Sequence, residues 1–253
     1  MLSPAEFGLV LVAAVAGGAV NALAGGGTLI TFPVLTAVGL PSVAANMTNT
    51  VALCPGYLGG TLAQRKDLRG QEPRLWRFIP AAVIGGLVGA LLLQVSSEHL
   101  FRFLVPYLIL LGTLLLAAQP RLRLWLDRRA PRFGGGSSET WGLPAAGLAT
   151  VYGGYFGAGL GVITLSVLGI ALQDSLTRLN ALKQAISLAT NVAAAVFFVF
   201  SGKVVWPAAI VMFLGSLLGG SLGGRLAGRV KPELLRGVVV GIGLVVALIY
   251  FVS

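Results

Sequence analysis

Six apolar stretches, each about as long as a membrane-spanning helix, constrain the fold of this chain more than any other feature. They cover residues 43–62, 75–95, 100–118, 179–200, 204–224 and 233–252. A helix needs roughly 20 apolar residues to cross the hydrocarbon core of a bilayer. Only 10% of the residues are charged, whereas soluble domains carry about 25%. The sequence therefore predicts an all-α, multi-pass integral membrane protein.

Two further apolar regions, residues 5–39 and 141–173, are too long for a single crossing. Glycine-rich segments interrupt both of them: A-G-G-G-T at 24–28 and G-G-Y-F-G-A-G-L-G at 153–161. We expect each region to form a hairpin of two helices with a glycine-rich tip, either spanning or re-entrant. The expected total is eight to ten membrane helices.

Lysine and arginine cluster in three connections and predict the orientation. Segments 64–77, 121–138 and 225–232 carry most of these residues and should be cytoplasmic, while the sparse connections 39–42, 96–99 and 201–203 should lie on the opposite side. This distribution accounts for the net charge of +10 without a nucleic-acid partner. The N-terminus lacks the basic region of a secretory signal, so we expect it to be retained.

The two halves of the chain resemble each other. Each reads as a Gly-rich hairpin, a helix with polar residues, a glycine-striped helix and a leucine-rich helix. Asn46 and Asn49 precede Asn180 and Lys183 by 134 residues and keep their spacing. Because each half has three full crossings, the halves should be inserted oppositely, as in many secondary transporters. We therefore expect a first repeat at 1–118, a cytoplasmic linker at 119–140 and a second repeat at 141–253.

A polar stripe follows one face of the helix expected at 179–200. Asn180, Lys183, Ser187 and Asn191 are spaced three or four residues apart and should face the protein interior. A charge near the centre of a membrane helix costs about 3 kcal/mol and usually marks a pathway or a partner. The alternative is that Lys183 extends to the nearby interface. Because the stripe continues deeper than Lys183, we favour a substrate-binding role.

Polar and glycine residues at matching places complete the candidate substrate site. In the first half they are Asn46, Thr48, Asn49 and Thr50, together with Gly25, Gly26 and Gly27; in the second half they are Gly157 and Gly159. The helices that follow these glycines should point their N-termini at an anion, because free N–H groups and the helix dipole favour negative charge. The alternative is that the glycines serve only tight turns or close packing.

Acidic residues are absent from the interior of every expected helix. All eight lie in connections or at the ends of apolar runs: Glu6, Asp67, Glu72, Glu98, Asp127, Glu139, Asp174 and Glu233. A cation carrier or a carboxylate proton relay is therefore disfavoured. The single histidine, His99, and the single cysteine, Cys54, argue against a metal site, a cofactor or an enzyme. A small anion of low charge is the expected substrate.

Three segments together resemble the sulfite exporter TauE/SafE family of membrane anion permeases. They are G-G-G-T-L-I-T-F-P-V-L from Gly25 with the following A-N-M-T-N, R-L-N-A-L-K-Q from Arg178, and the long W-P-A-A-I-V-M-F-L-G segment from Trp206. The resemblance covers nearly the whole chain. It implies a permease in the bacterial inner membrane with two homologous halves, which moves sulfite, sulfoacetate, other sulfonates or related anions.

The family motifs also assign residues. By resemblance, the first Gly-rich motif corresponds to Gly25–Gly27 and Pro33, the Thr-Asn pair to Thr48 and Asn49, and the second-half Asn-x-x-Lys to Asn180 and Lys183. The second Gly-rich motif is looser here than in the family.

An anion permease, exporting by alternating access at a site between the repeats, is the expected function. An anion-selective channel of the same architecture, a permease for small carboxylates and a structural subunit are the alternatives. The expected partners are the small anion and the lipid bilayer. A homo-oligomer is compatible with the sequence.

Overall fold

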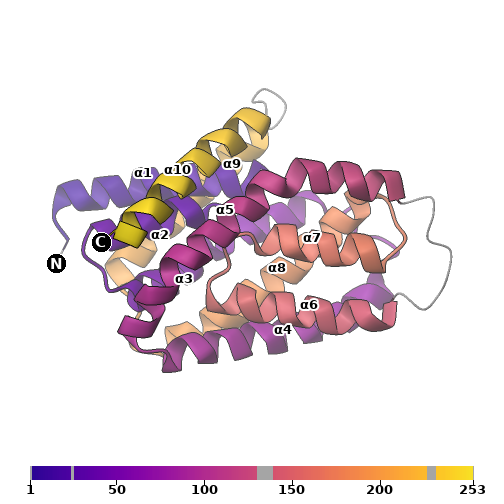
Figure 1. Cartoon of the computed structure of the whole chain (residues 1–253), viewed down its shortest axis with the longest axis horizontal. Coiled ribbons are helices and arrows are strands. Elements are labelled where there is room, and N and C mark those ends of the chain that lie inside the picture. Colours follow the sequence, from indigo (N-terminus) through magenta and orange to yellow (C-terminus); the bar gives the residue numbers. More distant parts are fainter. Residues whose placement is uncertain (1, 24–25, 130–138, 227–231, 253) are drawn as a thin grey trace.

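A computed structural model describes residues 2–23, 26–129, 139–226 and 232–252 of the chain. These residues form ten helices (Figure 1). The first five are α1 (Pro4–Leu23), α2 (Thr28–Ala37), α3 (Ser42–Ala63), α4 (Glu72–Val95) and α5 (Glu98–Arg129). The second five are α6 (Glu139–Tyr155), α7 (Leu160–Ala171), α8 (Leu176–Val199), α9 (Trp206–Leu226) and α10 (Pro232–Val252).

The all-helical fold class is confirmed, and the helices fall close to the expected stretches. Both apolar regions with central glycines form hairpins, α1–α2 and α6–α7, and the second helix of each is short. The helix α5 extends beyond the expected stretch 100–118 to Arg129, so residues 119–129 of the expected linker are helical. Residues 130–138 of the expected linker lie outside the described residues.

Four of the described helical segments are long and apolar enough to cross a membrane. They are Pro4–Asn21, Glu72–Val95, Glu98–Leu126 and Leu176–Val199. The helix α3 is long enough but does not belong to this group, because Asn46, Thr48, Asn49 and Thr50 lower its hydropathy. The protein is a multi-pass membrane protein, and its α3 is a polar helix inside an apolar bundle.

The helices of the first half pack on those of the second half in reciprocal pairs. Helix α1 packs along α9, and α4 packs along α6; α3 contacts α9, and α4 contacts α8; α3 and α8 contact each other. If each helix of the first half is exchanged with its counterpart in the second half, α1 with α6 and so on to α5 with α10, every one of these pairs becomes another of them or stays the same. This reciprocity is what two related repeats would produce, and the opposite insertion of the two halves in the bilayer stays a prediction.

Glycines allow these helix pairs to approach closely. A methyl group at Gly154 of α6 would lie 2.2 Å from the carbonyl oxygen of Gly86 on α4, and one at Gly18 of α1 would lie 2.4 Å from the carbonyl oxygen of Ser216 on α9. A side chain at either position would require the backbones to separate. The glycine stripes therefore serve helix packing, as in other membrane helices.

The two hairpin tips approach the middle of α5. Gly26 lies beside Leu116, and Gly159 lies beside Gly112 and Leu115. In Figure 1 the α1–α2 hairpin lies in the left half of the molecule and the α6–α7 hairpin in the right half. Gly159 caps the start of α7 with a φ of 80°, a backbone conformation that favours glycine. The tip geometry places the start of the half-length helix α7 inside the bundle.

Candidate functional site

Lys183 is the centre of the candidate site in the second repeat. It is the eighth residue of α8, and its side chain is only 9% exposed. Its Cδ, Cε and Nζ atoms lie 3.6–3.8 Å from the place that a methyl group would take at Gly161, the second residue of α7. A lysine that extended to the interface would expose its ammonium. The burial instead favours the interior role predicted from the sequence.

Two buried hydroxyls occupy the same surfaces of α7 and α8. Ser187 follows Lys183 by one turn of α8, and Thr164 follows Gly161 by one turn of α7. Both side chains are at most 1% exposed, and neither hydroxyl has a hydrogen-bond partner among the described residues. Since a buried polar group without a partner is costly, such hydroxyls are available to a ligand. We use the name Lys183 pocket for Lys183, Gly161, Ser187 and Thr164, which are grouped by their places on α7 and α8.

The Lys183 pocket has the chemistry of an anion site. The ammonium lies at the N-terminal turn of α7, where the helix dipole adds partial positive charge. The two hydroxyls can donate hydrogen bonds to an anionic oxygen. Within the described ranges, no three His, Cys, Asp or Glu side chains come together in a way that could hold a metal ion.

The remaining members of the α8 stripe lie on either side of the pocket. The Nδ2 of Asn180 donates to Gln64 Oε1 at 2.7 Å, and its Oδ1 has no partner in the described part of the chain. The Nδ2 of Asn191 donates to the carbonyl oxygen of Ser187 at 2.8 Å. The side chains of Asn191 and Tyr57 of α3 lie near each other. The polar stripe of α8 therefore lies alongside α3, from the C-terminal end of α3 to the point where the two helices cross.

Asn49 occupies the equivalent place in the first repeat but makes different contacts. Its Oδ1 accepts from Thr31 Oγ1 at 2.5 Å, and its Nδ2 donates to Thr28 Oγ1 at 3.3 Å. Both threonines belong to the first turn of α2. Leu160 and Ile163, which like these threonines are the first and fourth residues of their helix, carry no hydroxyl. Asn49 therefore fastens the start of α2 to α3, whereas Lys183 faces a turn without side-chain hydroxyls.

The other polar residues of α3 hold neighbouring elements. Thr48 Oγ1 accepts from the backbone N–H of Val205 at 3.0 Å, and Thr50 Oγ1 donates to the carbonyl oxygen of Asn46 at 2.9 Å. The Nδ2 of Asn46 donates to the carbonyl oxygen of Tyr155 at 2.8 Å, at the tip of the second hairpin. This bond fixes the amide orientation, and the buried Asn46 Oδ1 has no partner among the described residues.

Asn49 and Lys183 do not meet in one pocket, contrary to the paired site that the repeat predicts. Cys54 Sγ contacts the carbonyl oxygen of Asn191, and Gly60 lies against Gln184. With this register, Lys183 of α8 lies beside the part of α3 that is about twelve residues after Asn49. At 1.5 Å per residue, this separation is roughly 18 Å. The physical reason is that α3 and α8 are antiparallel. Two equivalent residues of these helices therefore lie on opposite sides of the point where the helices cross, and they are further apart the further each is from that point. Polar residues instead form a line along the α3–α8 pair.

The glycines of the candidate site lie at the hairpin tips. Gly26, Gly157 and Gly159 have φ values of 106°, 83° and 80°. A methyl group at Gly27 would lie 2.3 Å from the carbonyl oxygen of Gly17, so Gly27 closes the first hairpin. Gly25 lies outside the described residues.

Several residues of the site were not predicted from the sequence. Thr164 and Gly161 complete the Lys183 pocket, and Thr28 and Thr31 bind Asn49. Asn21, at the end of α1, packs near Gly27 and lies close to Tyr57. Thr28 and Gly161 are the last residues of the two Gly-rich segments, and Thr31 and Thr164 follow them by three residues; this position was the available signal.

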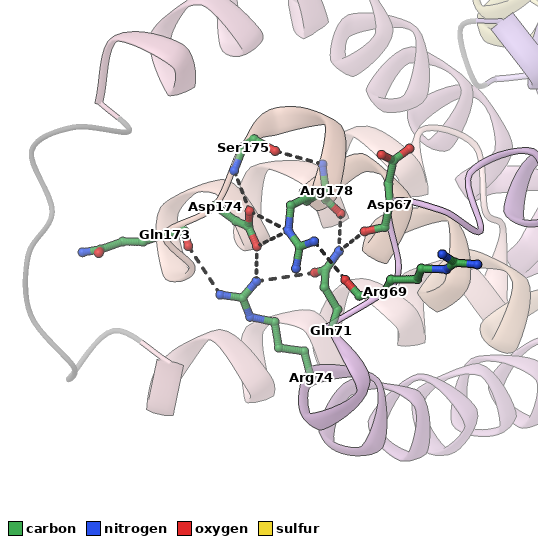
Figure 2. A network of polar contacts seen from close by, with 8 residues as sticks. All are labelled: Asp67, Arg69, Gln71, Arg74, Gln173, Asp174, Ser175 and Arg178. Carbon is green, nitrogen blue, oxygen red and sulfur yellow. Dashed lines mark hydrogen bonds and ion pairs between the residues drawn. The ribbon is translucent and has the colours of Figure 1, made fainter.

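Ion pairs connect the two repeats at the opposite end from the hairpin tip of α6–α7 (Figure 2). Asp174, in the α7–α8 connection, accepts from Arg74 Nη1 of α4 at 2.5 Å and from Arg178 Nε of α8 at 3.0 Å. Gln71 Nε2 donates to the carbonyl oxygens of Arg178 and Asp67. We call Arg74, Asp174 and Arg178 the Asp174 cluster.

The carboxyl group of Asp174 has a lowered pKa. Burial of Asp174 by itself raises the pKa, and the hydrogen bonds from Arg178, Arg74 and the Ser175 backbone together outweigh it. The carboxylate therefore remains charged at neutral pH, and the cluster holds the first and second repeats together at this end.

The bundle of apolar helices, with short helices after glycine-rich tips and a buried polar line, defines a multi-pass membrane transporter. The sequence profile of the family described as sulfite exporter TauE/SafE matches residues 9–250. The chain belongs to this family, which confirms the resemblance inferred from its motifs.

Curated relatives agree with this class. The chain is 28% identical over 242 residues to the probable membrane transporter protein YfcA of Escherichia coli (strain K12), a match that covers 95% of this chain and 87% of that protein. It is 29% identical over 199 residues to a probable membrane transporter protein of Haemophilus influenzae, covering 79% and 76% of the two chains. No solved structure shows a significant match.

Proposed function

We propose that this transporter moves small sulfur-containing or organic anions, such as sulfite, sulfoacetate or other sulfonates, and exports them by alternating access. The observation that carries the proposal is the Lys183 pocket. There, a buried ammonium lies at the start of a half-length helix, and the buried hydroxyls of Ser187 and Thr164, each one turn further along its helix, have no hydrogen-bond partner among the described residues. The description of the family supports a sulfur oxyanion as the substrate. We place the protein in the bacterial inner membrane.

The polar line along α3 and α8 supports a pathway through the bundle. It runs from Asn180 through Lys183, Ser187 and Asn191 toward Asn49, and Asn46 lies beyond. Hydroxyl and amide groups at these positions can replace part of the hydration shell of an anion. The line explains why polar residues follow both helices over most of their length.

The ends of the bundle differ in a way that suits alternating access. At one end the Asp174 cluster bridges the two repeats. The residues 134 positions away from its members are Leu40, Ala44 and Ala208, all apolar. One end is thus closed by ion pairs, whereas the other end has apolar residues at the equivalent positions and a hydrogen bond from the backbone N–H of Val205 to Thr48. The two ends can open in alternation while the hairpins keep their contacts with α5.

Export follows from charge and needs no proton relay. An inside-negative potential drives an anion outward by about 2.3 kcal/mol per charge per 100 mV. In proteoliposomes, an imposed potential should therefore change the rate of sulfite efflux, and flux that ignores the potential would contradict this direction.

The binding experiment is thermal stabilisation of the purified protein by sulfite, sulfoacetate, thiosulfate, sulfate and lactate. At a ligand concentration 100 times Kd, binding stabilises the folded state by about 2.7 kcal/mol. Lys183→Gln should abolish the stabilisation. The matched control is Lys203→Gln, because Lys203 is exposed and its ammonium donates to the carbonyl oxygen of Gln94, away from the Lys183 pocket. If no anion stabilises the wild type, or if both variants respond alike, the proposed site is wrong.

A channel of the same architecture is the second candidate, since a line of polar groups could also conduct. Saturating flux that speeds up when substrate is present on the far side marks a carrier. Ohmic single-channel current through the same protein would mark a channel and refute alternating access.

A further inference from the structure

A cleft of about 830 Å³ lies where α2, α5 and α10 meet. Its walls are mainly apolar side chains from α2 and α10: Ile30, Pro33, Val34, Ile242, Val246 and Ile249. Ile242 is 38% exposed and Ile249 is 57% exposed, as expected for side chains that face lipid. In Figure 1, α2 and α10 lie in the left half of the molecule, where α5 also begins before it runs across to the right half. None of these walls takes part in the Lys183 pocket.

Two charged residues of α5 line one edge of the cleft, and their charges are not equally available. The Glu98 carboxylate accepts hydrogen bonds from the backbone N–H groups of Ser42 and Val43, the latter at 3.0 Å. These groups form the N-terminus of α3, whose dipole stabilises the negative charge. Arg102 follows one turn later, is exposed and lies near Tyr250. The cleft edge therefore presents a positive group to its surroundings.

The second repeat uses the equivalent arginine differently. Arg236 lies 134 residues after Arg102 and is only 8% exposed. Its Nε donates to Gln119 Oε1 at 3.2 Å, so it is part of the packing between α5 and α10. The exposure of Arg102 at a cleft is thus particular to the first repeat.

We propose that this cleft binds one phospholipid with an anionic headgroup. The headgroup phosphate lies at Arg102, and an acyl chain lies along the apolar walls of α2 and α10. We choose an anionic phospholipid as the ligand because of charge complementarity. An arginine at the edge of an apolar cleft in a membrane matches a lipid with a negatively charged head and an apolar tail. The cleft volume lies within the usual range of about 300–1,000 Å³ for ligand sites.

The bound lipid contacts an element of the proposed pathway. The cleft wall is α2, whose first turn holds Asn49 through Thr28 and Thr31. The other end of α2 is tied to α10 by the hydrogen bond between Thr36 and Tyr250. An acyl chain between α2 and α10 braces α2 in this position.

Native mass spectrometry of the detergent-purified protein, titrated with phosphatidylglycerol or phosphatidylethanolamine, tests the proposal. The wild type should retain one phosphatidylglycerol with about fivefold preference over phosphatidylethanolamine. Arg102→Gln should remove this preference, whereas Lys203→Gln, which removes a charge outside the cleft, should keep it. A wild type without preference, or equal losses in both variants, overturns the proposal.

A second variant tests the apolar part of the site without changing charge. Val246→Trp fills the cleft and should weaken the binding of both lipids. Unchanged binding in this variant places the lipid elsewhere and overturns the proposal. Glycerol phosphate carries the same phosphate without acyl chains and should not displace phosphatidylglycerol; displacement would mean a site for a soluble phosphate and would also overturn it.

Discussion

Gly161 offers the sharpest test of the Lys183 pocket. A methyl group there would lie 3.6 Å from Lys183 Cδ and 3.7 Å from Nζ, which is ordinary van der Waals contact. Gly161→Ala should therefore fold normally. Because alanine has a better helix propensity than glycine, the unliganded variant should gain up to about 1 kcal/mol in the free energy of unfolding.

The same methyl group should weaken anion binding. It occupies the space beside the ammonium that an anionic oxygen would use. A hydrogen bond to a charged group contributes about 1.5–3 kcal/mol. Its loss should raise Kd for sulfite or sulfoacetate by about tenfold or more, since 1.4 kcal/mol corresponds to a factor of ten.

The assay is thermal unfolding of purified Gly161→Ala with and without each anion, together with flux in proteoliposomes. The expected result is an unfolding temperature that is equal or higher without ligand and a clearly smaller shift with ligand. If the variant binds every anion as tightly as the wild type does, no ligand lies between Gly161 and Lys183, and the reasoning is refuted.

Three further predictions concern packing, the start of α2 and the Asp174 cluster. Gly89→Ala should destabilise the protein by about 1–3 kcal/mol or prevent folding, because its methyl group would lie 2.1 Å from the carbonyl oxygen of Val151; normal thermal stability would contradict this packing. Thr31→Val should cost about 1–3 kcal/mol in thermal unfolding, since it leaves Asn49 Oδ1 without a buried donor; an unchanged melting temperature would show that the bond is unimportant. The lowered pKa of Asp174 means that its contribution to stability is complete above the ordinary carboxyl pKa of 3.8 and is lost only as the pH falls below it. Cleavage by a protease at the 64–71 connection should thus be independent of pH between about 5 and 8 in the wild type and faster in Asp174→Asn; equal rates in the two proteins would refute the closure.

The helices could be predicted closely from the sequence, while the site could be predicted only in part. Membrane helices follow from apolar length, so the expected stretch 75–95 and the observed α4 end at the same residue and differ by three residues at the start. The continuation of α5 to Arg129 was missed because residues 119–129 carry charges, which end a membrane segment without ending a helix. The polar stripe containing Lys183 was predicted, because periodicity on one helix is a local property.

By itself, the sequence determined the membrane class, the two glycine-broken hairpins and the buried lysine, since each depends on residues that are close together in the chain. Only the tertiary structure decided which polar groups meet. The register of α3 against α8 separates Asn49 from Lys183, and the packing of α7 on α8 brings Gly161 to the lysine. Contacts between distant segments depend on how helices cross, and helix periodicity does not contain that information.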